Sequence, residues 1–186
     1  IDPVRKIGYV RLTTFGRETG PDLRRVLTRL TRQGMKGLIL DLRFSPGGLI
    51  DTGLTTANLF TKEGAILRME DGRSQGKTIS ARREALLVNC PMVCLVNGDT
   101  VCLAEAVAAC LQDHQRAPIV GERSRGKGSV QNIYPAEGGR ELTLTTAVLL
   151  RPSGKKLDVM RLRGHGADEW GVAPDAGYDV PLPARE

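Results

Sequence analysis

The sequence predicts an α/β protein built around a largely buried sheet. Segments with strand character alternate with segments of helical spacing along the 186 residues. Residues 37–42 are apolar apart from one acid, as is typical of a strand buried on both faces. A helix begins near Pro21, with apolar residues at helical spacing: Leu23, Val26, Leu27 and Leu30. This alternation of strand and helix places the chain in the α/β class.

The elements are expected in a fixed order along the chain. Strands are predicted at residues 7–12, 37–42, 91–96, 118–121 and 142–150. Helices are predicted at residues 21–33, about 50–60 and 104–113. Gly34 ends the first helix, and a tight turn at Pro46-Gly47-Gly48 precedes the second. The polar segment 62–84 is expected to form surface strand and loop.

Composition excludes several classes of protein. Hydrophobic residues make up 40% and charged residues 26%, which is ordinary for a globular protein. The net charge of +6 is spread along the chain, with few aromatic residues for base stacking, so no nucleic-acid partner is expected. No apolar run approaches the roughly 18 residues of a membrane span, so none is expected. The first six residues contain no signal-peptide apolar region.

All four cysteines fall in one stretch: Cys90, Cys94, Cys102 and Cys110. A disulfide framework would spread its cysteines to join distant segments. Zinc ligands would come as C-x-x-C pairs or with nearby histidines. Neither pattern is present, so no metal or other cofactor is expected. Most of these thiols are interpreted as buried packing.

A glycine-rich segment at residues 121–129 (GERSRGKGS) resembles a phosphate-binding loop. Gly128 occupies the position of the magnesium-binding hydroxyl, and the following residues indicate a strand where such a loop needs a helix. Nucleotide binding is therefore not predicted. Lys127, flanked by glycines, could instead approach another backbone closely and act as a buried base. The alternative is a solvated lysine on an exposed loop.

Cys102 lies where the predicted strand 91–96 and a short loop lead into the helix at 104–113. A thiol at a helix N-terminus meets the positive end of the helix dipole, which favours the thiolate. The alternative is a cysteine packed beneath the helix.

Together these segments resemble the carboxyl-terminal processing (tail-specific) proteases over nearly the whole chain. The matching blocks are residues 7–10, 37–43, 46–48, 96–98 with Glu105, 111–114, 120–122, 126–131, 152–154 and 171–175. The resemblance implies a crotonase/ClpP-like core of stacked β-β-α units, with a mixed sheet flanked by helices. It also implies that residues 1–186 form one protease core domain, without the family's PDZ domain.

The resemblance implies specific roles for residues of the candidate site. In the family a serine attacks the peptide carbonyl, a lysine 25 residues later is the general base, and a glutamine four residues further on orients that lysine. Lys127 and Gln131 fit this spacing, and Cys102 stands at the position of the serine. The oxyanion hole of the family maps to the backbone N–H groups of Gly48 and Leu103.

The resemblance further implies a polypeptide substrate, recognised through its C-terminus, an extracytoplasmic location and a possible homo-oligomer. Sulfur is larger than oxygen, and Val101 and Leu103 are bulkier than the family's usual neighbours of the nucleophile. The alternative is therefore a weakened or inactive pseudoprotease. It would bind extended peptides along the strand edge at residues 12–15 and the turn at Gly47-Gly48.

Two other enzyme classes remain as hypotheses. An acyl-CoA enzyme on a related crotonase-like fold would need an oxyanion hole and a carboxylate base, but no Lys/Gln pair. A Cys/His protease would use His114 or His165. His114 lies about 15 Å from Cys102 if the intervening helix is intact, which excludes direct contact. His165, between glycines, is interpreted as a surface-loop residue.

Overall fold

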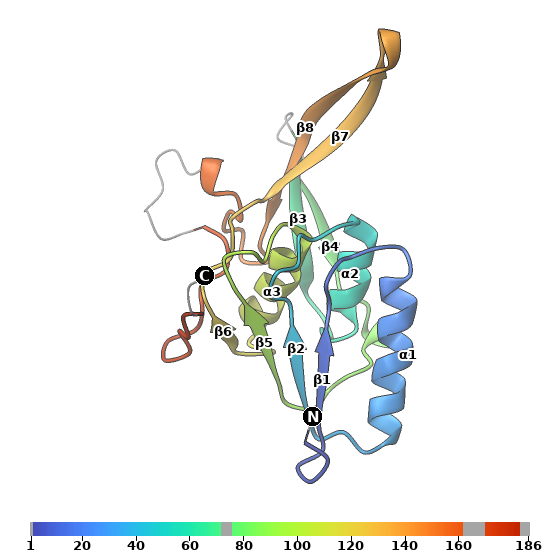
Figure 1. Ribbon diagram of the computed structural model, residues 1–186, viewed down its shortest axis with the longest axis vertical. Coiled ribbons are helices and arrows are strands. Elements are labelled where there is room, and N and C mark those ends of the chain that lie inside the picture. The colour runs from blue at the N-terminus through green and yellow to red at the C-terminus, as the bar shows by residue number, and fades with distance from the viewer. Residues whose placement is uncertain (1, 72–75, 162–169, 183–186) are drawn as a thin grey trace.

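The computed structural model describes residues 2–71, 76–161 and 170–182, and it has two four-stranded sheets (Figure 1). The strands are β1 (Ile7–Arg11), β2 (Gly37–Asp41), β3 (Ala65–Asp71), β4 (Gly76–Ser80), β5 (Met92–Val96), β6 (Ile119–Gly121), β7 (Ser129–Ala136) and β8 (Arg140–Leu150). The helices are α1 (Thr19–Arg32), α2 (Ile50–Asn58) and α3 (Leu103–Asp113), with short 3-10 turns η1 (Arg83–Ala85), η2 (Glu137–Gly139) and η3 (Val159–Arg161). The predicted α/β fold is confirmed.

The first sheet is parallel and has the order β1-β2-β5-β6. Its central strands, β2 and β5, contribute wholly buried side chains such as Leu40 and Cys94. The second sheet is antiparallel and has the order β4-β3-β8-β7. Parallel and antiparallel pairings are thus divided between two sheets.

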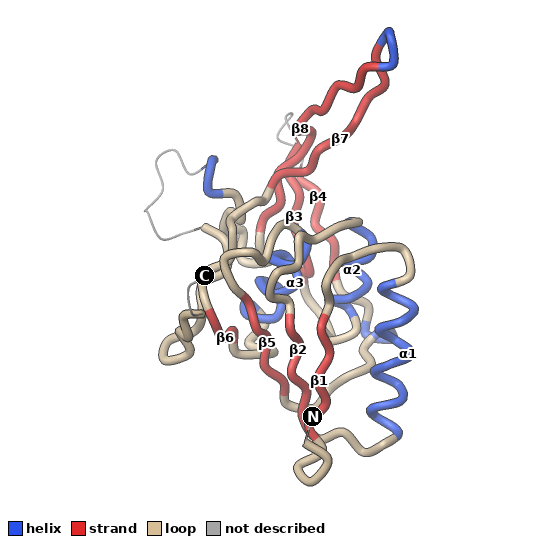
Figure 2. The backbone as a smooth tube through the Cα atoms, in the orientation of Figure 1, coloured by secondary structure: helices blue, strands red, loops and turns tan. Residues whose placement is uncertain are grey.

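Helix α3 forms the centre of the molecule (Figure 2). It contacts β5 of the parallel sheet, β3 of the antiparallel sheet and helix α2. Each residue from Leu103 to Leu111 is buried, in keeping with the small side chains of its alanine-rich sequence. In the described part of the chain no helix has the length and apolar character of a membrane span.

Strands β7 and β8 form a long hairpin that projects from the body (Figure 1). Only residues 147–150 of β8 pair with β3, so the rest of the hairpin is a two-stranded ribbon. Four large apolar side chains of this ribbon are exposed: Ile133, Tyr134, Leu142 and Leu144. The pairing shifts between Val130 and Gln131, which marks a bulge at the base of the ribbon.

The loops that carry the predicted site leave the carboxyl ends of neighbouring parallel strands. The segment with the Pro-Gly-Gly turn follows β2, and the segment with Cys102 follows β5. Ligands of parallel sheets are generally bound at this edge. The fold therefore brings the glycine turn and the cysteine together.

Candidate functional site

Cys102 lies at the N-terminus of α3 with a strained backbone, φ 56° and ψ −116°. Residues other than glycine rarely adopt a positive φ, and this strain costs on the order of 1–3 kcal/mol. A sharp, strained turn between a strand and a helix exposes the nucleophile in the α/β-hydrolases. The surrounding structure must hold Cys102 in this conformation.

Hydrogen bonds on both sides hold the cysteine turn. The backbone N–H of Cys102 donates to Glu105 Oε2 at 2.8 Å, and that of Val101 donates to the carbonyl of Ser45 at 2.8 Å. Gly47 packs directly against this turn, because a Cβ on Gly47 would lie 3.0 Å from Cys102 Cβ. The glycine turn therefore forms one wall of the space beside the thiol.

Gly48 is held against Phe15. The N–H of Phe15 donates to the carbonyl of Gly47 at 2.9 Å, and the N–H of Leu49 donates to the carbonyl of Phe15 at 2.8 Å. In this bridge geometry the N–H of Gly48 points away from Phe15. The edge at residues 12–15, predicted to bind peptides, is thus already paired at Phe15, and the Leu12 N–H bonds the Asp41 carbonyl.

The size of Leu103 suggested that its side chain would take space from the substrate. In the structure the side chain does not lie on the substrate side of the site. Its side chain is buried and points toward Gly53 of α2, where an added Cβ would lie 2.8 Å from Leu103 Cδ1. Its backbone N–H bonds the Cys102 thiol and lowers the pKa of that thiol. The bulk of this residue is therefore taken up by the core.

Gly53→Ala is expected to destabilise the protein, because the new methyl group would overlap the Leu103 side chain. We expect a loss of about 1–3 kcal/mol in the free energy of unfolding, as for other overpacked cores. Urea unfolding followed by circular dichroism measures it. The double variant Gly53→Ala/Leu103→Ala should lose less than the sum of the two single changes, and strict additivity would contradict the contact.

Lys127 reaches the site through its backbone. Its N–H donates to Glu105 Oε2 at 2.9 Å, while its side chain is exposed. The flanking glycines allow close approach as predicted: a Cβ on Gly126 would lie 2.6 Å from Trp170, and one on Gly128 would lie 2.7 Å from the Asp158 nitrogen. Close approach is therefore confirmed, but the lysine side chain is not buried.

The pKa of the Cys102 thiol is raised from its usual value. Burial is the largest cause, and the Glu105 charge adds to it. The Leu103 N–H and the Lys127 charge lower the pKa, but by less than burial raises it. The expected stabilisation of the thiolate at the helix N-terminus is therefore outweighed by desolvation.

Gln131 does not bond the lysine through its side chain among the described residues. It lies on β7 with an exposed side chain, and among the described residues no hydrogen bond joins the Gln131 and Lys127 side chains. Catalytic hydrogen bonds are often long or absent without substrate, so the orienting role of Gln131 stays a prediction.

Glu105 was expected only as part of a block that resembles the family, and the sequence assigned it no role in the site. Its side chain is wholly buried and accepts hydrogen bonds from both the cysteine turn and the lysine loop. The signal was present, because Glu105 stands three residues after Cys102 at a helix start, the spacing of a capping box.

The other candidates fall outside this site. His114 caps the far end of α3, with Nε2 2.7 Å from the Ala65 carbonyl, and so does not face Cys102. His165 lies outside the described residues. The segment after Lys127 is strand β7, as expected, and not the helix of a phosphate-binding loop. The described residues include no cluster of His, Cys, Asp or Glu suited to a metal ion.

The remaining cysteines are not placed to react. Burial raises the pKa of Cys94 and raises that of Cys110 to about 11. Cys90 is half-buried, and burial raises its pKa as well. The interpretation of these three thiols as packing residues is supported by their burial.

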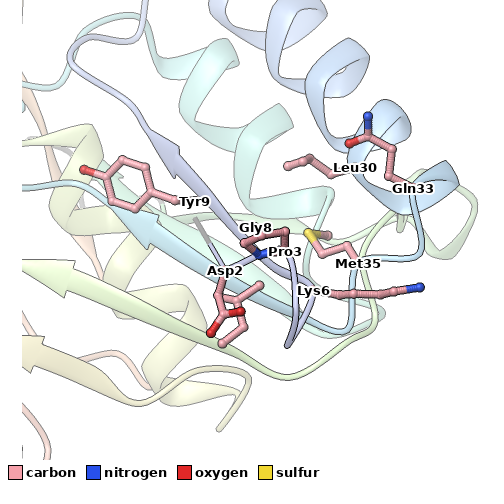
Figure 3. Close-up of a pocket in the computed structure, with 9 residues that line it drawn as sticks. Asp2, Pro3, Lys6, Gly8, Tyr9, Leu30, Gln33 and Met35 are labelled. Atoms are coloured by element: carbon pink, nitrogen blue, oxygen red, sulfur yellow. The ribbon is translucent and has the colours of Figure 1, made fainter.

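A separate cavity of about 350 Å³ opens beside β1 (Figure 3). Its lining includes Asp2, Lys6, Tyr9 and Met35, and none of the predicted site residues. This cavity therefore does not belong to the cysteine site.

Comparison with known families decides the relationship. Residues 6–176 match the family described as Peptidase family S41. The chain belongs to this family. The S41 chain is 36% identical over 185 residues to a carboxy-terminal-processing protease of Bartonella bacilliformis, covering 96% of this chain and 40% of that protein. It is 33% identical over 180 residues to a carboxyl-terminal-processing protease of Synechocystis sp., covering 97% of this chain and 40% of that protein.

Solved structures agree with this assignment. The photosystem II D1 C-terminal processing protease matches with a TM-score of 0.77 and 32% identity, over 95% of this chain and 42% of that one. An S41 protease structure from Bacteroides fragilis shares the fold, with a TM-score of 0.74 and 17% identity, over 94% of this chain and 47% of that one. The S41 chain thus spans about two fifths of the length of these curated relatives.

Proposed function

We propose that this chain is the catalytic core of a C-terminal processing peptidase in which Cys102 replaces the usual serine nucleophile. The observation that carries the proposal is the strained Cys102 turn at the start of α3, packed against Gly47 and within electrostatic reach of Lys127. Lys6, Phe44 and Gln115 also have a positive φ, but Cys102 combines this strain with the start of α3 and the glycine turn, which fits a nucleophile better than a packing residue.

The mechanism follows from the chemistry of these groups. Because burial raises the pKa of the Cys102 thiol, attack needs a base, and Lys127 Nζ accepts the Sγ proton as sulfur bonds the carbonyl carbon. The N–H groups of Gly48 and Leu103 stabilise the oxyanion. Collapse of the tetrahedral intermediate expels the amine of the cleaved peptide, which takes the proton from Lys127. Water then attacks the thioester with Lys127 as base, releasing the acid and restoring the thiol.

Gln131 would orient Lys127 once substrate closes the site. The exposed position of both side chains in this conformation is consistent with such a late step. The substrate is a polypeptide recognised near its C-terminus, which the names of the relatives support. An extracytoplasmic location and a homo-oligomer belong to the same proposal.

A peptide-binding pseudoprotease is the second candidate. Two observations favour it: the raised pKa of the Cys102 thiol and the absence of a hydrogen bond between the described side chains of Lys127 and Gln131. The two candidates differ in whether the lysine acts on the thiol.

We expect Lys127→Ala to slow alkylation of Cys102. The lysine charge lowers the pKa of the thiol, so its loss raises that pKa and reduces the thiolate fraction at every pH below it. Because the lysine is exposed and screened, we expect a slowing of about 2- to 5-fold at low salt, and less at high salt. Iodoacetamide labelling from pH 7 to 10, quantified for Cys102 by peptide mass spectrometry, measures it.

The matched control is Lys77→Ala, which removes an exposed lysine from β4 at the far edge of the antiparallel sheet. It should leave Cys102 labelling unchanged. Equal labelling in the wild type and Lys127→Ala would show that the lysine does not act on the thiol, and the pseudoprotease would then be the better description.

A further inference from the structure

The Glu105 carboxylate receives four hydrogen bonds. Oε1 accepts from the Ser124 hydroxyl at 2.5 Å and from the Gly126 N–H at 2.6 Å. Oε2 accepts from the N–H groups of Cys102 at 2.8 Å and Lys127 at 2.9 Å. An ionised carboxylate has about four acceptor sites, so these donors use its whole capacity.

These donors belong to two segments that are distant in sequence. Cys102 lies at the N-terminus of α3, whereas Ser124, Gly126 and Lys127 lie in the loop between β6 and β7. A single oxygen, Oε2, is bound by the backbones of both Cys102 and Lys127. One oxygen atom therefore links the backbones of these two residues.

The lysine loop is also held on its outer side. The N–H of Ser124 donates to the Val172 carbonyl at 2.9 Å, and the N–H of Val172 donates to Ser124 Oγ at 2.8 Å. The loop is thereby pressed against Glu105, since a Cβ on Gly171 would lie 2.9 Å from Ser124 Oγ. The loop also bonds the segment just before Cys102, because the Arg125 N–H donates to the Thr100 carbonyl at 3.0 Å. The contacts to Glu105 are those that involve the backbones of Cys102 and Lys127 themselves.

We propose that Glu105 is a positioning residue that sets the separation of Cys102 and Lys127 by binding the backbone of both. The inference rests on the proposed function, because it assigns Glu105 to the reaction of that site. The carboxylate acts through the geometry of the other two residues and touches no substrate.

The charge of Glu105 gives a second reason to assign this residue a positioning role. The negative charge of Glu105 raises the pKa of the Cys102 thiol and so opposes formation of the thiolate. A group kept for its charge effect on the nucleophile would do the opposite. What Glu105 contributes is therefore the placement of the two backbones.

The test is a double-mutant cycle between Glu105→Gln and Lys127→Ala, read by Cys102 alkylation. The amide keeps the shape of the side chain but has one acceptor oxygen in place of two. Whichever way it is turned, its NH₂ group faces the N–H of Gly126 or of Lys127, so at least one bond to the backbone of the lysine loop is lost. In the wild type, Lys127→Ala should slow Cys102 labelling about 2- to 5-fold. In the Glu105→Gln background the same change should have almost no effect, because the lysine is no longer held near the thiol.

Peptide hydrolysis gives the second readout. Misplacing reacting groups by about 1 Å can cost about 100-fold, so Glu105→Gln should lower kcat by that order with little change in KM. The matched control is Ser124→Ala, which removes a donor that is neither Cys102 nor Lys127 and leaves the shared oxygen Oε2 bound. It should lower kcat less than tenfold and preserve the effect of Lys127→Ala on labelling.

The buried thiols Cys94 and Cys110 report unfolding in the same labelling experiment, because they are inaccessible in the folded protein. If Glu105→Gln exposes them, the cycle is run with Glu105→Asp, whose shorter carboxylate cannot reach both segments and should also abolish the coupling. An unchanged effect of Lys127→Ala in a folded Glu105 variant would overturn the inference. Coupling that depends on Glu105 without any hydrolysis by the wild type would refute the proposed function alone.

Discussion

Cys102→Ala is expected to reduce peptide hydrolysis to the background rate, a loss of at least about 10³-fold. Alanine removes the only sulfur at the strained turn and leaves no group that can form a covalent intermediate. The fold should be retained, because the side chain is only partly buried and the turn is held by backbone bonds. Release of a fluorophore from a peptide ester and a peptide amide measures the loss.

Cys102→Ser tests whether hydrolysis requires a sulfur nucleophile or only a nucleophilic side chain at this position. A serine restores the residue used by the family, so we expect hydrolysis that persists but no longer responds to iodoacetamide. Equal activity of Cys102→Ala and the wild type would contradict the assignment. Inactivity of the wild type together with activity of Cys102→Ser would mean that the cysteine has weakened an otherwise intact site.

Gly48→Ala is expected to damage both folding and catalysis. A Cβ at this position would lie 2.4 Å from the Phe15 carbonyl oxygen, at a backbone φ of 149° that side chains rarely adopt. The turn must move, and we expect a loss of about 2–4 kcal/mol in the free energy of unfolding. If the Gly48 N–H binds the oxyanion as proposed, moving it should cost a further 10²- to 10³-fold in kcat.

Gly139→Ala is the matched control for this prediction. Gly139 also has a positive φ, 72°, but an added Cβ would meet nothing within 4 Å at the tip of the hairpin. Its substitution should cost only the backbone strain, about 1–2 kcal/mol, and leave kcat unchanged. Urea unfolding and steady-state kinetics on both variants test the comparison. Similar effects of the two changes would mean that the contact with Phe15 is unimportant.

Much of the fold could be predicted because local patterns dictate it. The apolar run of β2 and the helical spacing of α1 were sufficient to place both elements within a few residues. The spacing of Cys102 and Lys127 could likewise be read from the chain. Each of these features can be recognised within a short stretch of sequence or as a fixed number of residues between two side chains.

The features that could not be predicted depend on contacts between segments that are distant in sequence. The direction of the Leu103 side chain depends on Gly53, fifty residues earlier, so its bulk was misjudged. The edge at residues 12–15 looked open, but Phe15 pairs with Gly47 and Leu49. The balance of desolvation and charge at Cys102 depends on burial that local sequence does not reveal.

Trp170 is the only tryptophan of the chain, and it packs on Gly126, next to Lys127. The Arg123 guanidinium lies 4.9 Å from its ring centroid. Indole emission depends on such neighbours, so the protein carries an intrinsic fluorophore at the lysine loop. Movement of that loop when a peptide binds can therefore be followed optically, without labels and before any bond is cut.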